Sequence, residues 1–314
     1  MSDGLVYGPV PSRRLGRSLG VDLVPFKTCT FDCIYCQLGR TTDRTTQRAR
    51  WHDPDEVLAQ ICAHLRTHPD VIALAGSGEP TLADGIGEVV DGIKSLTDIP
   101  LAVITNGSLL GDATVQRDLR HVDIILPSLD AVDEQSFRTI NRPHGSISFN
   151  ELVDGLISFR AAFSGRVWLE IMLLDGHTAT EARVEKLAAL AARIQPDKVQ
   201  LNTVARPPAE PQARPVTPER LAGFADAFTP PAEVVAGAPE PQTGCEATAA
   251  DVLALVRRRP CTAADVAAGL GMHRNEALKA LSALVDTGEL RSRNHDGRAY
   301  YAAADGDSRG PEGS

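Results

Sequence analysis

Hydrophobic and polar residues alternate in blocks along most of the chain. Six short apolar runs are typical of buried strands, and segments with apolar residues at helical spacing lie between them. The strands are expected at 20–24, 71–75, 101–105, 123–126, 167–173 and 198–202, and the helices near 53–66, 84–96, 112–118, 149–163 and 178–194. This order predicts parallel β/α units. Because six strands are too few for a closed eight-stranded barrel, the expected fold class is α/β, a partial (β/α)6 barrel over residues 18–228.

The segments that flank this barrel have a different composition. Residues 1–17 are rich in Gly, Pro and Arg and predict an irregular lead-in. A short helix is expected at 217–228. Prolines then recur through 229–247, which predicts a linker that lets the following unit move. Residues 306–314 are expected to form a disordered tail.

A new pattern begins at residue 248. Three helical segments and two β-like stretches follow one another at 248–258, 262–269, 274–287, 290–293 and 298–301. Asp296-Gly297 between the β-like stretches is a hairpin turn signal. Three helices and a hairpin are the layout of a winged helix-turn-helix. We therefore expect a small winged helix-turn-helix domain over 248–305.

Charge and composition limit the classes of function. The net charge of −9 argues against a surface that binds nucleic acid throughout, and no apolar run approaches the roughly 20 residues of a membrane helix. The N-terminus lacks a signal-peptide layout, so we expect a cytoplasmic protein without membrane contact. Two local basic segments could still bind an anionic partner. They are Arg40, Arg44, Arg48 and Arg50, and the stretch 248–301 with eight Arg or Lys against six Asp or Glu.

Three of the six cysteines lie within eight residues. Cys29, Cys33 and Cys36 follow the first expected strand with the spacing C-x3-C-x2-C. A loop with this spacing can hold three irons of a [4Fe-4S] cube, and iron–sulfur clusters normally take four cysteines. One iron would therefore stay open to a small molecule. The motif predicts a catalytic cluster rather than a simple electron carrier.

Two other uses of the cysteines were considered. A structural zinc site needs a fourth Cys or His at a second paired spacing, and His52 and Cys62 do not supply one. A second cluster built from Cys62, Cys245 and Cys261 would have only three ligands where four are usual. A buried free cysteine is the simpler interpretation of Cys261.

The cysteine motif, with Tyr35 just before its last cysteine, resembles the signature of the radical S-adenosylmethionine (radical SAM) superfamily. The resemblance implies a radical SAM barrel whose open iron binds the amino and carboxylate groups of S-adenosylmethionine. One electron, from a flavodoxin- or ferredoxin-type donor, then splits the sulfonium and gives a 5′-deoxyadenosyl radical. The resemblance places Tyr35 near the adenine.

A glycine-rich turn supports the same interpretation. Gly76, Ser77, Gly78 and Glu79 directly follow the second expected strand. Glycines allow the backbone to approach other groups closely, and a carboxylate accepts from an ammonium. The turn resembles the family's GGE motif with a serine in its middle. The resemblance implies that this turn binds the methionyl amino group.

Polar residues also follow the third and fourth strands. Ser128 is our first choice for contacts to the ribose and the methionyl carboxylate, and Asn106 and Asp130 are second choices. Asn106 could instead belong to a plain turn, and Asp130 could cap a helix. Glu170 and Asn202, on the fifth and sixth strands, could point into the barrel, where a buried Glu would need a partner.

The segments Tyr7–Gly16 and Leu201–Pro208 resemble a prokaryotic branch grouped with the wyosine-base (tRNA imidazoguanosine) synthases. Those synthases use a second cluster on additional N-terminal cysteines, and this chain has no Cys before Cys29. The resemblance implies an enzyme that modifies a macromolecule, a tRNA or a protein, delivered by the winged helix. An iron–sulfur winged-helix regulator that senses redox state or iron is the alternative. The turn at Gly76–Glu79 favours the enzyme, since a sensor needs no methionyl site.

Overall fold

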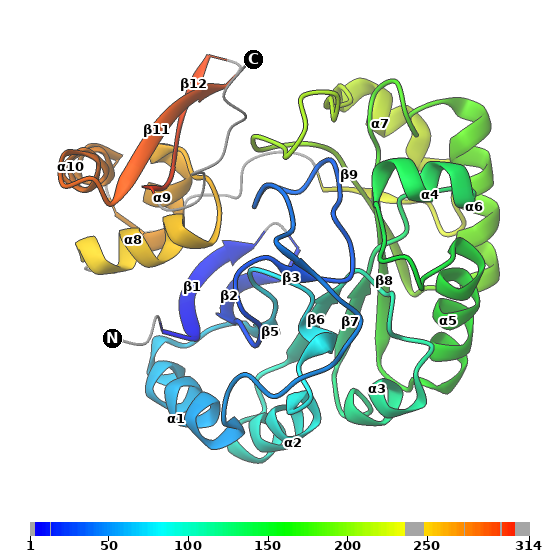
Figure 1. The fold of residues 1–314 in the computed structure, drawn as a ribbon, viewed down its shortest axis with the longest axis horizontal. Coiled ribbons are helices and arrows are strands. Elements are labelled where there is room, and N and C mark those ends of the chain that lie inside the picture. The colour runs from blue at the N-terminus through cyan, green and yellow to red at the C-terminus, as the bar shows by residue number, and fades with distance from the viewer. Residues whose placement is uncertain (1–3, 13, 236–247, 273, 296, 305–314) are drawn as a thin grey trace.

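The computed structural model describes residues 4–12, 14–235, 248–272, 274–295 and 297–304. Its largest element is a sheet with the strand order β1-β2-β5-β6-β7-β8-β9-β10 (Figure 1). β1 runs antiparallel to β2, and every later neighbour pair is parallel. The strands are β1 Val6–Ser12, β2 Gly16–Val21, β5 Val71–Leu74, β6 Leu101–Thr105, β7 Ile124–Pro127, β8 Arg166–Met172, β9 Lys198–Asn202 and β10 Glu233–Val234. Five of the expected strands lie at nearly their predicted positions, and the first, expected at 20–24, lies earlier, at Gly16–Val21. The α/β fold class is confirmed.

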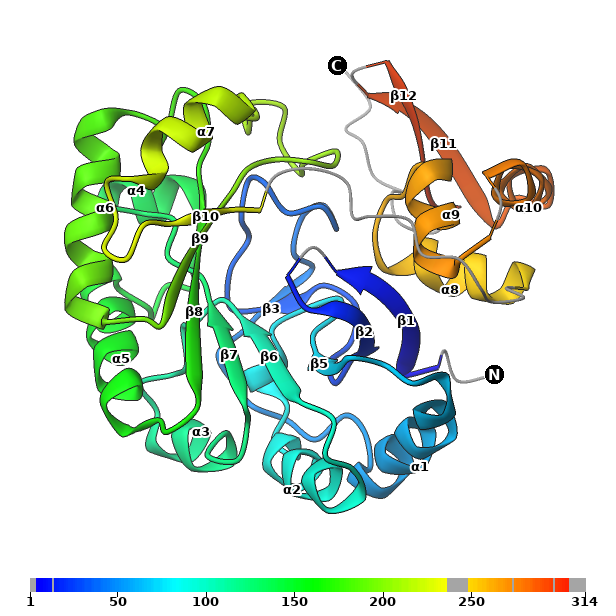
Figure 2. The same cartoon turned by 180° about the vertical axis from the view of Figure 1, so that it is seen from behind.

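Helices cover the outer face of the curved sheet, as both views show (Figures 1 and 2). The expected helices are α1 Pro54–His64, α2 Ile86–Leu96, α3 Ala113–Asp118, α5 Phe149–Ala162, α6 Glu181–Ile194 and α7 Pro218–Ala225. α1 begins as its sequence predicts, because Asp53 accepts from the Asp55 N–H and Pro54 occupies the first turn. None of the described helices combines the length and the apolar character that crossing a bilayer requires.

Two flanking segments differ from the expectation. The lead-in at 1–17 was expected to be irregular, but β1 lies within it and pairs with β2. Prolines are tolerated there because an edge strand has one side that needs no donors. The start of the expected linker at 229–247 also forms a strand, β10, on the other edge of the sheet. Residues 236–247 and the expected tail lie outside the described residues.

Several short elements were not predicted. They are α4 Glu134–Ile140, the 3-10 helices η1 Leu65–Thr67 and η2 Pro80–Leu82, and the paired strands β3 Thr28–Cys29 and β4 Asp43–Arg44. A helix of seven residues spans too few turns to show a hydrophobic period. Of these elements, β3 contains Cys29, which lines the cavity at the ends of the strands.

The C-terminal unit has its own small core. Its elements are α8 Ala249–Arg258, α9 Ala263–Leu270, α10 Arg274–Asp286, β11 Leu290–His295 and β12 Arg298–Ala303. The helices meet around Val252, Val266 and Leu281, each fully buried. Gly288 adopts φ +77° after α10, a conformation that glycine tolerates best. Asp296 of the expected turn lies outside the described residues.

This unit rests on β1 and on the end of β2. Val10 of β1 packs against the small core. Arg258 of α8 donates to Asp22 at 2.7 Å, and its guanidinium lies 4.2 Å from the centre of the Tyr7 ring. The Asp22 and Arg258 side chains are only 8% and 15% exposed. The C-terminal unit is thus packed against the sheet, whereas the sequence predicted a module that moves on its linker.

Removing one partner of this ion pair should destabilise the protein. Arg258→Ala leaves the Asp22 carboxylate buried without its cation, which costs about 3 kcal/mol of unfolding free energy. Urea denaturation of Arg258→Ala and of the control Lys279→Ala, an exposed position on α10, checks this. A loss of the same small size in both variants would contradict a structural ion pair.

Candidate functional site

A cavity of about 410 Å³ lies at the carboxyl ends of the parallel strands. Its size is within the usual range for ligand pockets. Loops after β2, β5, β6, β7, β8 and β9 form its walls, and Leu255, Arg258 and Arg259 close it from the C-terminal unit. Of the predicted site residues, the cavity is lined by Cys29, Cys33, Cys36, Tyr35, Gly76, Ser77, Gly78, Glu79, Asn106 and Ser128. Asp130 is the one predicted residue outside this lining.

Two apolar side chains hold the cysteine loop in place. Phe31 is 2% exposed and packs edge-on against Phe137 of α4, with ring centres 5.3 Å apart. Ile34 is 1% exposed, and its N–H bonds the Ile140 carbonyl at the end of the same helix. Burying these two residues between the cysteines leaves the three sulfurs to face the cavity. The unpredicted α4 is therefore the support of the motif.

The thiols lie in a dry environment with amide donors nearby. Asn106 Nδ2 is 3.5 Å from the Cys29 sulfur, and Asn141 Nδ2 is 3.6 Å from the Cys33 sulfur. Burial raises the pKa of the Cys29 thiol to about 12 and also raises the pKa of Cys33 and Cys36. Thiolates here need a strong cationic partner, and a metal centre deprotonates its thiol ligands outright.

The donor set fits an iron–sulfur cluster. Three cysteines line one cavity, and soft thiolates are the ligands that such clusters take. Within the described ranges, no three or more His, Cys, Asp or Glu side chains are arranged to hold a single metal ion. Cys62 is exposed on α1 and Cys261 is buried in the C-terminal unit. Neither lines the cavity, and Cys245 lies outside the described residues.

The glycine-rich turn is packed against the cysteine loop. Two backbone bonds join them, from Lys27 N to Ser77 O at 2.7 Å and from Glu79 N to Thr28 O at 3.0 Å. A Cβ at Gly78 would collide with the Thr28 carbonyl oxygen. The glycine therefore lets β3, and with it Cys29, lie directly on the turn. Gly78 thus allows a close approach between two segments of the protein's own backbone.

Asp22 makes the second close approach to this turn. It accepts from both the N–H and the hydroxyl of Ser77, and a Cβ at Gly76 would collide with its carboxylate. Burial raises the pKa of Asp22, while the bonds from Ser77 and the charge of Arg258 lower it. A chain of contacts thus runs from the turn through Asp22 to α8 of the C-terminal unit.

Glu79 is almost completely buried at 2% exposure. Its Oε1 accepts from the hydroxyls of Thr105 at 2.6 Å and Thr81 at 2.7 Å, and its Oε2 accepts from Asn106 N at 2.7 Å. Burial raises its pKa, and these hydrogen bonds oppose the rise. Glu79 thus caps η2 and fixes the end of β6 as well as lining the cavity.

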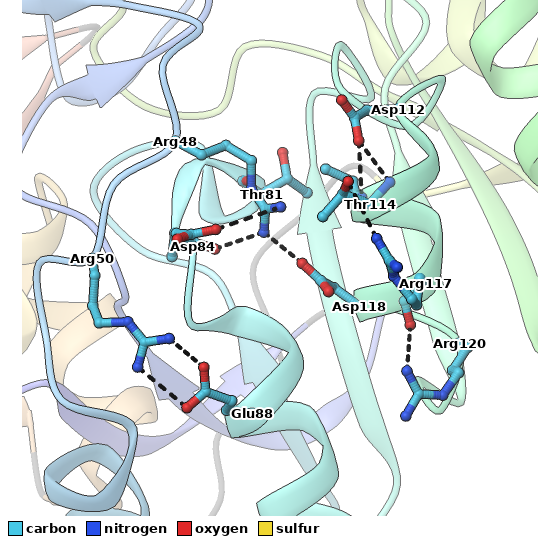
Figure 3. A network of polar contacts seen from close by, with 12 residues as sticks. Arg48, Arg50, Thr81, Asp84, Glu88, Asp112, Thr114, Arg117, Asp118 and Arg120 are labelled. Atoms are coloured by element: carbon cyan, nitrogen blue, oxygen red, sulfur yellow. Dashed lines mark hydrogen bonds and ion pairs between the residues drawn. The ribbon is translucent and has the colours of Figure 1, made fainter.

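Arginines after the cysteine loop hold the same region from outside (Figure 3). Arg48 donates to the carbonyl of Thr81 at 3.0 Å and to Asp118 of α3 at 2.7 Å. Arg50 pairs with Glu88 of α2. The predicted basic segment is thus largely neutralised by neighbouring carboxylates and carbonyls, since Arg40 also pairs with Asp32. It braces the loop and does not form an open cationic patch.

Asp130 lies behind Tyr35 and not on the cavity wall. It accepts from the Tyr35 hydroxyl, from Asn141 Nδ2 at 2.9 Å and from Met172 N at 2.9 Å. Burial raises the pKa of both Asp130 and Tyr35. Asp130, a second-choice ligand contact, thus lies outside the cavity lining, and it holds the hydroxyl of Tyr35, which does line the cavity.

The polar side chains at the other strand ends differ in whether they already have hydrogen-bond partners within the protein. Within the described part of the chain, the Ser128 hydroxyl has no hydrogen-bond partner, and the residue lines the cavity. Glu170 does point inward, and it finds partners in Arg14 and in Asn202 Nδ2 at 3.0 Å. Arg14 was missed because the lead-in was interpreted as irregular.

Comparison with known proteins is consistent with this geometry. The model of the radical SAM superfamily matches residues 23–190. UPF0026 protein MJ1312 of Methanocaldococcus jannaschii is 32% identical over 310 residues, and the match covers 95% of both chains. A radical SAM methyltransferase from Sphaerobacter thermophilus shares the fold, with a TM-score of 0.53 and 21% identity over 69% of this chain and 65% of that chain.

A second relative is the protein named GTPase Obg from Brachyspira hyodysenteriae, which is 34% identical over 304 residues. The match covers 95% of this chain, and this chain spans 45% of that protein's length. The present sequence has no Gly-Lys pair and thus no GTPase-type phosphate loop. The superfamily match includes the three cysteines and Glu79, and the chain therefore belongs to the radical SAM superfamily, whose enzymes use a [4Fe-4S] cluster and S-adenosylmethionine.

Proposed function

We propose that this enzyme cleaves S-adenosylmethionine reductively and uses the resulting radical to modify a macromolecule, with RNA as the favoured substrate. The observation that carries the proposal is that Cys29, Cys33 and Cys36 line one cavity together with the Gly76–Glu79 turn. When bound, the cluster and S-adenosylmethionine supply one electron and a sulfonium that splits into methionine and a 5′-deoxyadenosyl radical. A flavodoxin- or ferredoxin-type protein is the proposed donor of that electron.

The protein's own residues have distinct roles in this proposal. The three cysteines hold the cluster, and the buried Glu79 carboxylate accepts from the methionyl ammonium. The Ser128 hydroxyl and the Asn106 amide lie at neighbouring strand ends, where they bind the ribose and methionyl oxygens. Tyr35, oriented by Asp130, contacts the adenine.

RNA is favoured by the C-terminal unit. Its three helices and hairpin have the order of a winged helix-turn-helix, and we propose that this unit recognises the substrate. Residues 248–301 carry eight Arg or Lys against six Asp or Glu, in a chain whose net charge is −9. The resemblance of Tyr7–Gly16 and Leu201–Pro208 to proteins grouped with tRNA-modifying synthases supports the same substrate class.

Loss of any one cluster cysteine should remove the iron. Anaerobically reconstituted wild-type protein should bind about four irons per chain, as one cube does. Cys29→Ala, Cys33→Ala and Cys36→Ala should each lose most of it, and Cys62→Ala, an exposed position on α1, should keep it. Iron analysis and the charge-transfer absorption check this. Full iron content in Cys33→Ala would refute the assignment of the ligands.

The activity itself is tested without any substrate. Wild-type protein with dithionite and S-adenosylmethionine should form 5′-deoxyadenosine, and a protein that forms none would contradict the proposed function. Glu79→Gln should keep its iron but bind S-adenosylmethionine about tenfold more weakly, because hydrogen bonds to charged groups contribute roughly 1.5 kcal/mol or more. Glu88→Gln, exposed on α2, is the control. Equal affinities in the two variants would exclude Glu79 as the ammonium acceptor.

RNA binding should depend steeply on salt. Each phosphate contact on a single strand lowers the logarithm of the affinity by about 0.7 per tenfold rise in salt. Reversing Arg293 and Arg298, both exposed on the hairpin, to Glu should weaken binding and reduce this slope. Arg291 is left unchanged because its Nε is buried. The matched control reverses Lys186 and Arg193 on α6 to Glu. Equal effects of the two double reversals would argue against the hairpin as the RNA surface.

A further inference from the structure

The cavity is positively charged although the chain is acidic. Five cationic side chains line it, and two carboxylates do. The cations are Arg14, Lys27, Arg206, Arg258 and Arg259, and the carboxylates are Glu79 and Glu170. With a net charge of −9 over the whole sequence, this concentration of positive groups requires its own explanation.

Four of the five cations are already engaged. Lys27 acts on the cysteine loop, where its charge lowers the pKa of Cys36 against the effect of burial. Arg14 pairs with Glu170, and Arg258 pairs with Asp22 at 2.7 Å. Arg206, from the loop after β9, lies 3.8 Å from Asp265 and donates to the Gln37 side-chain oxygen at 3.4 Å. The remaining cation is Arg259, at the end of α8.

Arg259 has no acceptor within the described part of the chain. Its Nε is buried and forms no hydrogen bond, and its guanidinium makes no ion pair with a described carboxylate. Arg206 and Arg259 both line the cavity. Buried donors are almost always paired, so this wall is suited to a ligand that brings its own oxygens.

S-adenosylmethionine does not account for this charge. It carries one carboxylate against a sulfonium and an ammonium, so it is itself a cation overall. Its predicted contacts also lie on other elements, at the cysteine loop, the Gly76–Glu79 turn and the ends of β6 and β7. The cationic wall therefore indicates a second, anionic ligand in the same cavity.

We infer that Arg259, with Arg206 beside it, binds a phosphate group of the substrate. The inference rests on the proposed function and adds to it, since it makes the C-terminal unit part of the substrate site. The planar guanidinium matches the oxygens of a phosphate in a two-point contact. In this arrangement α8 closes the cavity and also selects what enters it.

The hairpin favours a phosphate over an isolated carboxylate. Arg291, Arg293 and Arg298 lie on the same face of the hairpin as Tyr300, because side chains alternate and paired residues share a face. The Tyr300 hydroxyl donates to Ala205 O at 3.2 Å, directly before Arg206. Basic side chains thus continue from the hairpin to the cavity, as a chain of phosphates would need.

The test measures binding of inorganic phosphate to the reconstituted protein in the presence of S-adenosylmethionine. Calorimetry at constant ionic strength should show phosphate binding by wild type and by Arg257→Gln, an exposed neighbour on α8. Arg259→Gln should bind it about tenfold more weakly, as expected for loss of a charge-assisted hydrogen bond. Arg259→Lys keeps the positive charge but loses the two-point contact of the guanidinium, so its phosphate affinity should lie between those of wild type and Arg259→Gln. It decides the question if Arg259→Gln does not fold.

Further probes identify the source of the phosphate. Acetate should bind more weakly than phosphate, and equal binding would overturn the inference in favour of a carboxylate-bearing peptide. GMP and a ten-nucleotide RNA should both lose affinity in Arg259→Gln, and tighter binding of the RNA identifies a polynucleotide rather than a free nucleotide. No phosphate binding by wild type, or equal binding by Arg259→Gln, also overturns it. Absence of 5′-deoxyadenosine with intact phosphate binding would contradict only the proposed function.

Discussion

The buried carboxylate of Glu79 holds together the loops that form the cavity. The carboxylate accepts from the Thr105 hydroxyl and from Asn106 N at the end of β6. The backbone N–H of Glu79 donates to the Thr28 carbonyl, beside Cys29. A charge without water needs such donors, and Thr105, Asn106 and Thr81 supply them. Asn106 then extends the network to the Cys29 sulfur. The backbone and side-chain hydrogen bonds of one residue therefore place the first cysteine against the glycine-rich turn.

The same turn is linked on its other side to the C-terminal unit. Ser77 bonds Asp22, and Asp22 pairs with Arg258 of α8. Because both side chains of this pair are buried, the unit cannot leave without exposing a charge in an apolar site. The residues that would contact S-adenosylmethionine and those that would contact the substrate are therefore joined through one carboxylate.

Sequence reasoning found what is local in the chain. The parallel strands carry apolar runs, and the cysteines and glycines lie within short motifs, so both were predicted at nearly their observed positions. The position of Asp130 behind Tyr35, outside the cavity lining, is visible only in the folded chain. The pairing of Asp22 with Arg258 joins residues 236 positions apart. No pattern of neighbouring residues could have indicated that contact, nor the inward position of Arg14 from a segment expected to be irregular.

Net charge was the least informative property of the sequence. A value of −9 argued against a surface that binds nucleic acid throughout, yet the potential that a ligand meets depends on the charges around its own site. Here the arginines of the first predicted basic segment are paired with carboxylates, while Arg259 lines the cavity without an acceptor among the described residues. An acidic surface would repel a polyanion elsewhere, and the few arginines at the cavity would attract it. Acidity of the whole chain is thus compatible with an anionic substrate, and it would restrict binding to the place where the radical forms.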